Sequence, residues 1–239
     1  MAILEGEGVT KYFGGLAAVS NVDFQVDQGE IVGLIGPNGA GKTTLFGLIS
    51  ASYIPKPGVI KFKGENITGL KSYQICRQGL VRTFQSVKIF PDMPVMSNVA
   101  LGVHFGSPER VTSAQADEEA AKLLEFVGLS EMAAIPARDL TLANQKLLEV
   151  ARALATKPEV LLLDEIMAGL NSTEIAQAME LVAKIRARGI SIFMIEHVMK
   201  AIMNICDRIM VLHHGEKIAE GTPQEIATSE TVVEVYLGE

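Results

Sequence analysis

The sequence is poor in several kinds of residue, and each shortage excludes a class of protein. It contains no tryptophan and two cysteines among its 239 residues. Cys76 and Cys206 are too few and too far apart for a disulfide framework or a zinc site. We therefore expect two free thiols in a reducing compartment.

Positive charge and long apolar runs are also scarce. The 21 basic residues are outnumbered by 28 acidic ones, which gives a net charge of −7 and argues against a general nucleic-acid binder. No apolar run approaches the roughly 18–20 residues that span a bilayer. The N-terminus lacks the basic and apolar segments of a signal peptide, so we expect a cytosolic chain. Because 48% of the residues are hydrophobic, a partner is expected to cover part of its surface.

Strand-like and helix-like segments alternate along most of the chain. This alternation predicts an α/β fold, with a mostly parallel sheet and helices on its faces. Strand signals vanish from about residue 87 to 155, which indicates a helical subdomain inserted into a single domain whose core is 1–86 and 156–239. The strand-like segments are 22–26, 31–35, 59–63, 160–163, 191–195 and 208–212, and the helix-like segments are 43–52, 114–127 and 144–155.

A glycine-rich stretch, GPNGAGKTT at 36–44, follows the apolar run 31–35 and precedes a helix-like segment. Its glycines allow backbone N–H groups to turn inward on a compact anion, and the helix adds its positive N-terminal end. Lys42 is expected to reach β- and γ-phosphates, and the Thr43 hydroxyl to ligate Mg²⁺. The position between a strand and a helix favours phosphate binding over an ordinary glycine turn.

A second motif joins an apolar strand to two carboxylates. Four apolar residues at 160–163 precede Asp164, which is expected at the C-terminal end of a buried strand, where open α/β sheets bind ligands. Asp164 is expected to hold the magnesium shell. Glu165 is placed to polarise a water for in-line attack on the γ-phosphate. A solvated loop is the alternative for these two acids, and the glycine-rich loop argues against it.

These motifs, in this order, resemble the ATP-binding subunits of ABC transporters over nearly the whole chain. The resemblance implies a P-loop NTPase core of the ABC ATPase type, with an N-terminal antiparallel β subdomain and the inserted helical subdomain. It implies ATP and Mg²⁺ as the bound groups. The residues expected to bind ATP in the Walker A motif are Gly36, Pro37, Asn38, Gly39, Ala40, Gly41, Lys42, Thr43 and Thr44.

Other positions match further motifs of the family. Gln85, in the Q-loop sequence RTFQ, would touch Mg²⁺ and the attacking water; a surface polar residue is the alternative. His197 would be the switch histidine on the γ-phosphate, or else a loop histidine. Phe13 would stack on adenine, with Tyr12 as a substitute and core packing as the alternative. Asn171 fills the D-loop position. Glu165, His197 and Gln85 are thus the expected catalytic residues.

The signature motif departs from the family's usual LSGGQ and reads LTLAN at 140–144. Ala143 adds a methyl group where a glycine backbone would approach the γ-phosphate, and Asn144 is shorter than glutamine. The resemblance implies that Thr141, Leu142, Ala143 and Asn144 face the ATP bound to a second ATPase subunit. Our hypothesis is that this chain hydrolyses ATP well only opposite a partner with a better signature.

Segments at 14–19, 79–85, 89–91 and 168–171 resemble the ATPase subunits of branched-chain amino acid importers and their urea or amide relatives. The resemblance implies a second ABC ATPase subunit in a homo- or heterodimer, transmembrane permease subunits and, indirectly, an extracytoplasmic solute-binding protein. It implies a peripheral place on the cytoplasmic face of the inner or plasma membrane, with no nucleic acid. A non-transport ABC ATPase and a nucleotide-dependent binding module with weakened hydrolysis are the alternatives.

The permease is expected to dock near 86–96, where four apolar side chains are predicted to be exposed. They are Val87, Ile89, Phe90 and Met93, and ordinary core packing is the alternative for them.

His213 and His214, before Gly215, are expected to form a turn after a strand.

Overall fold

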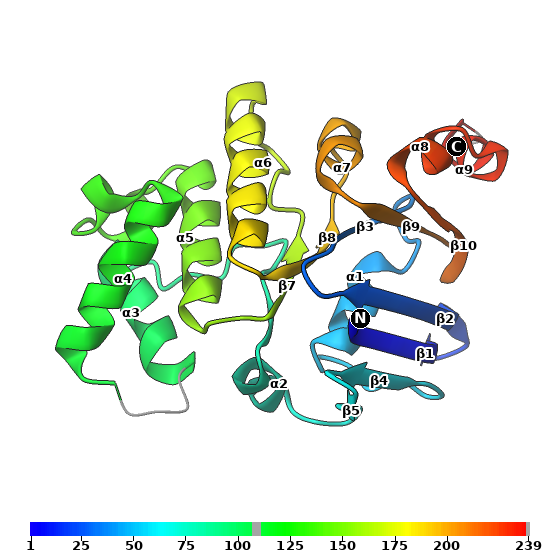
Figure 1. Cartoon of the computed structure of the whole chain (residues 1–239), viewed down its shortest axis with the longest axis horizontal. Helices are drawn as coiled ribbons and strands as arrows, with labels where there is room; N and C mark the ends of the chain where they lie inside the picture. The colour runs from blue at the N-terminus through cyan, green and yellow to red at the C-terminus, as the bar shows by residue number, and fades with distance from the viewer. Residues whose placement is uncertain (107–110, 238–239) are drawn as a thin grey trace.

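The computed structural model describes residues 1–106 and 111–237. Residues 107–110, which fall within the insert expected at 87–155, and residues 238–239 lie outside the described residues. The described chain forms two sheets with helices around them (Figure 1). Among the described residues, no helix combines the length and apolar character needed to cross a bilayer.

The larger sheet is mostly parallel, as predicted. In the part of the chain that the structure describes, five neighbouring strands pair in parallel, and a sixth strand pairs antiparallel at one edge of the sheet. In spatial order the strands are β10 (Glu216–Gly221), β9 (Arg208–His213), β3 (Ile31–Ile35), β8 (Ser191–Ile195), β7 (Val160–Asp164) and β6 (Leu80–Arg82). Of these, β6 and β10 were not predicted.

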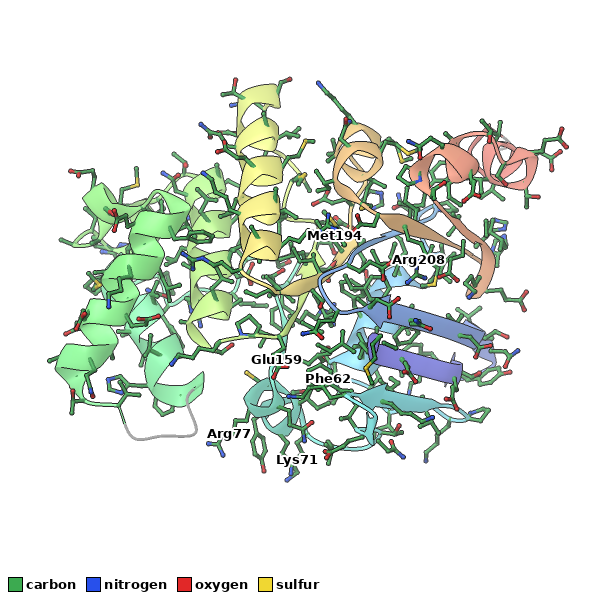
Figure 2. The ribbon with its side chains drawn as sticks, in the orientation of Figure 1. Phe62, Lys71, Arg77, Glu159, Met194 and Arg208 are labelled. Atoms are coloured by element: carbon green, nitrogen blue, oxygen red, sulfur yellow. The ribbon has the colours of Figure 1, made fainter. Side chains whose placement is uncertain are left out.

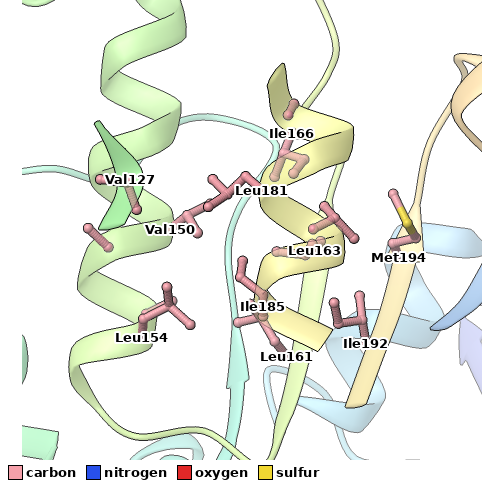
Figure 3. Packing of buried hydrophobic residues seen from close by; sticks show 14 of the residues in the cluster. Val127, Val150, Leu154, Leu161, Leu163, Ile166, Leu181, Ile185, Ile192 and Met194 are labelled. Atoms are coloured by element: carbon pink, nitrogen blue, oxygen red, sulfur yellow. The ribbon is translucent and has the colours of Figure 1, made fainter. Parts of the chain in front are cut away.

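Strands β3, β7 and β8 are buried along their whole length, which explains their continuous apolar sequences. Alternate residues enter opposite cores: Leu161 and Leu163 face one hydrophobic cluster, and Leu162 faces the other. On the first face these leucines pack among side chains of α5 (Leu142–Ala155) and α6 (Ser172–Ala187) (Figure 3).

The smaller sheet is antiparallel and lies over the other face of the larger one, around α1 (Lys42–Ile49) (Figure 1). It confirms the expected N-terminal antiparallel β subdomain. In spatial order its strands are β2 (Leu16–Asp27), β1 (Ala2–Phe13), β4 (Val59–Phe62) and β5 (Glu65–Asn66).

Three helices pack together at one end of the molecule: α3 (Val95–Gly106), α4 (Ser113–Val127) and α5 (Figure 1). Helix α4 matches the prediction and ends at Gly128, whose left-handed backbone supplies the stop. Helix α3 was not predicted. A Cβ on Gly102 would lie 2.8 Å from the Cβ of Ala155, so glycine permits α3 to approach α5 closely.

The remaining helices cover the sheets and their edges. Charged side chains such as Lys71 and Arg77 point away from the body of the molecule, whereas Met194 lies inside it (Figure 2). These helices are α2 (Ser72–Gln78), α7 (Met199–Ile205), α8 (Pro223–Ala227) and α9 (Glu230–Leu237), with 3₁₀ turns at Ser130–Met132 and Ala137–Asp139.

Candidate active site

The glycine-rich loop joins the C-terminal end of β3 to the first residue of α1, Lys42. Gly36 and Gly41 both have positive φ, at 148° and 102°. A Cβ at Gly36 would collide with the carbonyl of Leu212, and one at Gly41 with the carbonyl of Ala18. Both positions therefore require glycine, for conformation and for space.

Residues of this loop form one wall of a cavity of about 300 Å³. The structure brings Gln85, Glu165 and His197, far apart in sequence, to the same cavity. Its lining residues are Leu16, Ala17, Ala18, Asn38, Gly39, Ala40, Gly41, Lys42, Thr43, Thr44, Gln85, Glu165, His197 and His214.

Gly36 and Pro37 are not among those lining residues and instead support Lys42. The Lys42 ammonium donates to the carbonyl oxygens of Gly36, at 2.6 Å, and Pro37, at 2.9 Å. Burial lowers the pKa of Lys42, and the nearby carboxylates of Glu165 and Asp164 oppose that shift. The loop therefore carries a buried cation held by its own backbone.

The Glu165 carboxylate is held by a side chain on each oxygen. Its Oε2 accepts a hydrogen bond from Gln85 Nε2 at 2.8 Å, and its Oε1 lies 2.9 Å from His197 Nε2. The topology explains the meeting, because Gln85 follows β6 and His197 follows β8, the two neighbours of β7 in the sheet. Parallel strands bring these residues to one edge.

Asp164, the last residue of β7, is 1% exposed and forms an ion pair that was not predicted. Its Oδ2 accepts from Arg82 Nη2 at 2.7 Å, and Arg82 Nη1 also donates to Ser50 Oγ at 3.2 Å. Burial raises the pKa of Asp164 although Arg82 opposes the shift. The partner of Arg82 lies 82 residues further along the chain, so the local sequence carried no signal for this contact.

The structure places Phe13, the residue expected to stack on adenine, opposite Leu16 in the β1–β2 pair. Leu16, Ala17 and Ala18 line the cavity, whereas Phe13 is outside its lining and packs edge-on against Tyr53, with ring centroids 5.2 Å apart. Tyr12 and Phe13 are both exposed.

His214 also lines the cavity, and sequence reasoning assigned it to a turn alone. It does lie in the turn after β9, as expected. Because β9 runs parallel to β3, a residue just after β9 reaches the edge of the sheet where the glycine-rich loop lies. This topology was the missing signal, since the run at 208–212 already indicated a strand.

The signature residues lie apart from this cavity. Thr141 is the N-cap of α5 and accepts from the backbone N–H of Asn144 at 3.3 Å. Thr141, Ala143 and Asn144 line a separate cavity of about 250 Å³ between α5 and α6, and Leu142 is exposed.

Asn171, at the D-loop position, is the N-cap of α6. Its Oδ1 accepts from the backbone N–H groups of Thr173, at 2.9 Å, and Glu174, at 3.0 Å. Its side chain therefore stabilises the start of its own helix.

The expectation of four exposed apolar side chains near 86–96 is wrong for three of them. Phe90 is exposed, whereas Val87, Ile89 and Met93 are half-buried, and Ile89 packs against the main core. The reason is Asn98, which accepts from Phe90 N at 2.9 Å and donates to Phe90 O at 3.0 Å, and so holds this segment against α3.

Comparisons with known proteins agree with this geometry. A family model described as "ABC transporter" matches residues 19–168, and one described as "Branched-chain amino acid ATP-binding cassette transporter" matches residues 216–239. The high-affinity branched-chain amino acid transport ATP-binding proteins BraF of Pseudomonas aeruginosa and LivG of Escherichia coli K12 are each 41% identical, over 99% of this chain and 98% of theirs.

Solved structures show the same fold. The crystal structure of the ADP conformation of an ATP-binding cassette of an ABC transporter superposes with a TM-score of 0.90. It is 32% identical and covers 100% of both chains. A nucleotide-free cassette superposes with a TM-score of 0.89 at 30% identity. The chain therefore belongs to the ABC transporter family, as one of its ATP-hydrolysing cassettes.

Proposed function

We propose that this chain powers a membrane importer of branched-chain or related amino acids, as a peripheral ATPase subunit on the cytoplasmic face of the membrane. The matches to proteins named for branched-chain amino acid transport cover nearly the whole chain and support this solute class. The match at residues 216–239 adds support from a second segment. The comparisons give no support to the alternatives of a non-transport ATPase or a binding module.

The observation that carries the catalytic proposal is the Glu165 carboxylate held between Gln85 and His197 beside the phosphate loop. In this role Glu165 accepts a proton from the water that attacks the γ-phosphate. Gln85 and His197 fix the direction of the carboxylate. His197, whose side chain is 43% exposed, also faces the cavity and would contact the γ-phosphate.

The phosphate loop supplies the binding energy for the phosphates. Backbone N–H groups of residues 38–44 and the N-terminus of α1 favour an anion at this wall of the cavity. Lys42 brings a positive charge to the same wall. Phe13 remains our proposal for the adenine contact, with Leu16 and Ala17 beside it at the cavity edge.

The oxygen-bearing side chains at this edge fit Mg²⁺, which prefers oxygen ligands and keeps several waters. Among the described residues, Asp164 Oδ1 is buried without a hydrogen-bond partner. The Gln85 amide nitrogen binds Glu165, which leaves its oxygen available. Thr43, Gln85 and Asp164 would hold the ion, which would neutralise charge on the transferred phosphoryl group.

We further propose that Thr141, Leu142, Ala143 and Asn144 serve the ATP of a second ATPase subunit. Their separation from this chain's own cavity supports that arrangement. The methyl group of Ala143 and the short side chain of Asn144 weaken the contact. Hydrolysis is then fast opposite a partner chain with a better signature.

A groove of about 550 Å³ is the proposed docking site for a permease segment. The helical subdomain proposed at 87–155 supplies Phe90 and Phe105, and α2 supplies Tyr73. All three aromatic side chains are exposed, and Arg152 also lines the groove, with its guanidinium 4.8 Å from the centroid of the Phe90 ring. Exposed aromatic groups around one groove are typical of a protein interface.

Steady-state ATP hydrolysis by the purified chain and by Glu165→Gln tests the catalytic proposal. Loss of the general base is expected to lower kcat by about 10²-fold or more, while Mg-ATP binding is retained. An unchanged rate would exclude Glu165 as the base. If the parent chain binds Mg-ATP but does not hydrolyse it, the second subunit carries the competent signature.

Uptake measurements in cells test the solute class. Cells without this chain should lose uptake of labelled leucine and valine and retain uptake of urea. The Glu165→Gln chain should fail to restore leucine uptake, whereas the parent chain restores it. Loss of urea uptake alone would instead assign the chain to the urea relatives.

A further inference from the structure

Helix α5, which begins within the signature motif, carries a buried lysine that contacts the turn after β7, where Glu165 lies. Lys146, in the second turn of α5, is 7% exposed. Its ammonium donates to two backbone carbonyls, Glu165 O at 2.9 Å and Ala168 O at 2.5 Å. A buried ammonium group is costly unless its hydrogen bonds are made, and here they are made to a single turn.

That turn carries Glu165 in a conformation that most residues avoid. Glu165 has a φ of 53°, in the left-handed region that is unfavourable without glycine. Within the turn, Ala168 N donates a hydrogen bond to Glu165 O at 3.2 Å. Such a conformation persists when several contacts from the surrounding structure hold the backbone in place.

The surroundings hold the turn from two directions. Lys146 binds its carbonyls from the side of α5, and the buried Glu196 accepts from Met167 N at 2.8 Å from the end of β8. Glu149, three residues after Lys146, is also buried and accepts from Phe84 N and Lys88 N. Helix α5 thus contacts the backbones of both segments that carry Glu165 and Gln85.

We propose that Lys146 is a positioning residue for ATP hydrolysis: it holds the strained turn that carries Glu165 and so couples the position of α5 to that of the Glu165 carboxylate. The proposal rests on the proposed role of Glu165 as the base. It means that a shift of the signature end of α5 changes the geometry of hydrolysis in the same chain, and not merely the contact with a second subunit.

The test compares Lys146→Met, which keeps the side-chain length without the charge, with Lys146→Arg, which keeps the donors. The control is Lys184→Met, because Lys184 on α6 is exposed and pairs with Glu180. We expect Lys146→Met to lower kcat by about 10- to 100-fold, because a misplacement of about 1 Å has that effect, with KM within about threefold. Lys146→Arg should recover part of kcat, and Lys184→Met should match the parent.

Amide hydrogen exchange supplies a readout independent of turnover. In Lys146→Met the amides of 165–170 should exchange faster, while those of 36–44 keep the parent's protection. Unchanged kcat and exchange would overturn the proposal, as would a uniform loss of protection across the chain with a matching rise in KM. Where Lys146→Met does not fold, Lys146→Gln, which can donate to one carbonyl, gives the same comparison.

Glu165→Gln, measured in parallel, separates this proposal from the one it rests on. If Glu165→Gln turns over like the parent, the assigned base is wrong, and exchange at 165–170 in Lys146→Met still decides whether Lys146 holds the turn. If Glu165→Gln is inactive and Lys146→Met is fully active, the positioning role alone is wrong.

Discussion

Buried charges gather where β6, β7 and β8 end. Asp164 and Arg82 form an ion pair whose side chains are 1% and 8% exposed, and Lys146 and Glu196 are buried beside the next turn. Asp164 and Arg82 are each other's partner, and removal of either one leaves the other without compensation. Buried pairs respond strongly to loss of one member, even where the intact pair adds little net stability.

Arg82→Met should destabilise the chain, because Asp164 would remain buried without its cation. We expect the free energy of unfolding to fall by about 3–5 kcal/mol, measured by urea denaturation at neutral pH. Arg82→Lys is the control that keeps the charge, and it should lose less. A fall below about 0.5 kcal/mol in Arg82→Met would show that the pair does not compensate Asp164.

Glu196 gives the chain a pH-dependent stability. Burial raises the pKa of Glu196 from 4.5 to about 7, so between these values the folded state binds more protons than the unfolded state. Stability from this group is therefore present at low pH and falls as pH rises through that window, by up to about 3 kcal/mol.

Glu196→Gln should remove this dependence, because the amide keeps an acceptor for Met167 N and does not ionise. Urea denaturation at intervals from pH 5 to pH 8 should show a smaller decline with pH in Glu196→Gln than in the parent. Equal slopes for the two chains would mean that Glu196 does not titrate in this window.

At the scale of single elements, α6 depends on Asn171 for its start. Asn171→Ala removes the acceptor for Thr173 N and Glu174 N and should lower the free energy of unfolding by about 0.5–2 kcal/mol. Asn171→Asp is the control, since it keeps the acceptor and adds a favourable charge at the helix N-terminus. Equal stability of Asn171→Ala and the parent in thermal unfolding would contradict the capping role.

Elements with a local signal were predictable from the sequence. The apolar spacing of α4 and the run of β7 are each complete within about fifteen residues, so local reasoning places them. Helix α3 escaped prediction because Gly102 interrupts its pattern and Gly106 is its last residue. The reason for glycine there is the approach of α5, which only the tertiary structure shows.

The candidate site divides in the same way. Residues within motifs, such as Lys42 and Glu165, could be identified because their spacing along the chain is their signal. Arg82 and Lys146 could not, since each acquires its role from a partner that the fold supplies. The role of Phe13 stays a prediction from its motif position: its exposed ring packs edge-on against Tyr53, outside the cavity lining.

At the scale of the whole molecule, the exposed signature and the phosphate cavity are the two halves of a shared site in the proposed dimer. Glu165→Gln with saturating Mg-ATP should form stable dimers, because ATP adds contacts between chains and is not consumed. Light scattering after size exclusion should give twice the chain mass with ATP and the chain mass with ADP. Chain mass under both conditions would favour a heterodimer with a different ATPase subunit.

The position of β3 within the larger sheet has a consequence for synthesis of the protein. The strand before the phosphate loop, 31–35, pairs with β8 and β9, and its first residue bonds Asp207 at a separation of 176 residues. Because synthesis proceeds at about 5–20 residues per second, roughly 10–40 s pass between translation of β3 and translation of the strands that pair with it. The β1–β2 hairpin is complete at residue 27, so the small sheet can begin to fold on the ribosome. The larger sheet, which positions the nucleotide site, can form only much later.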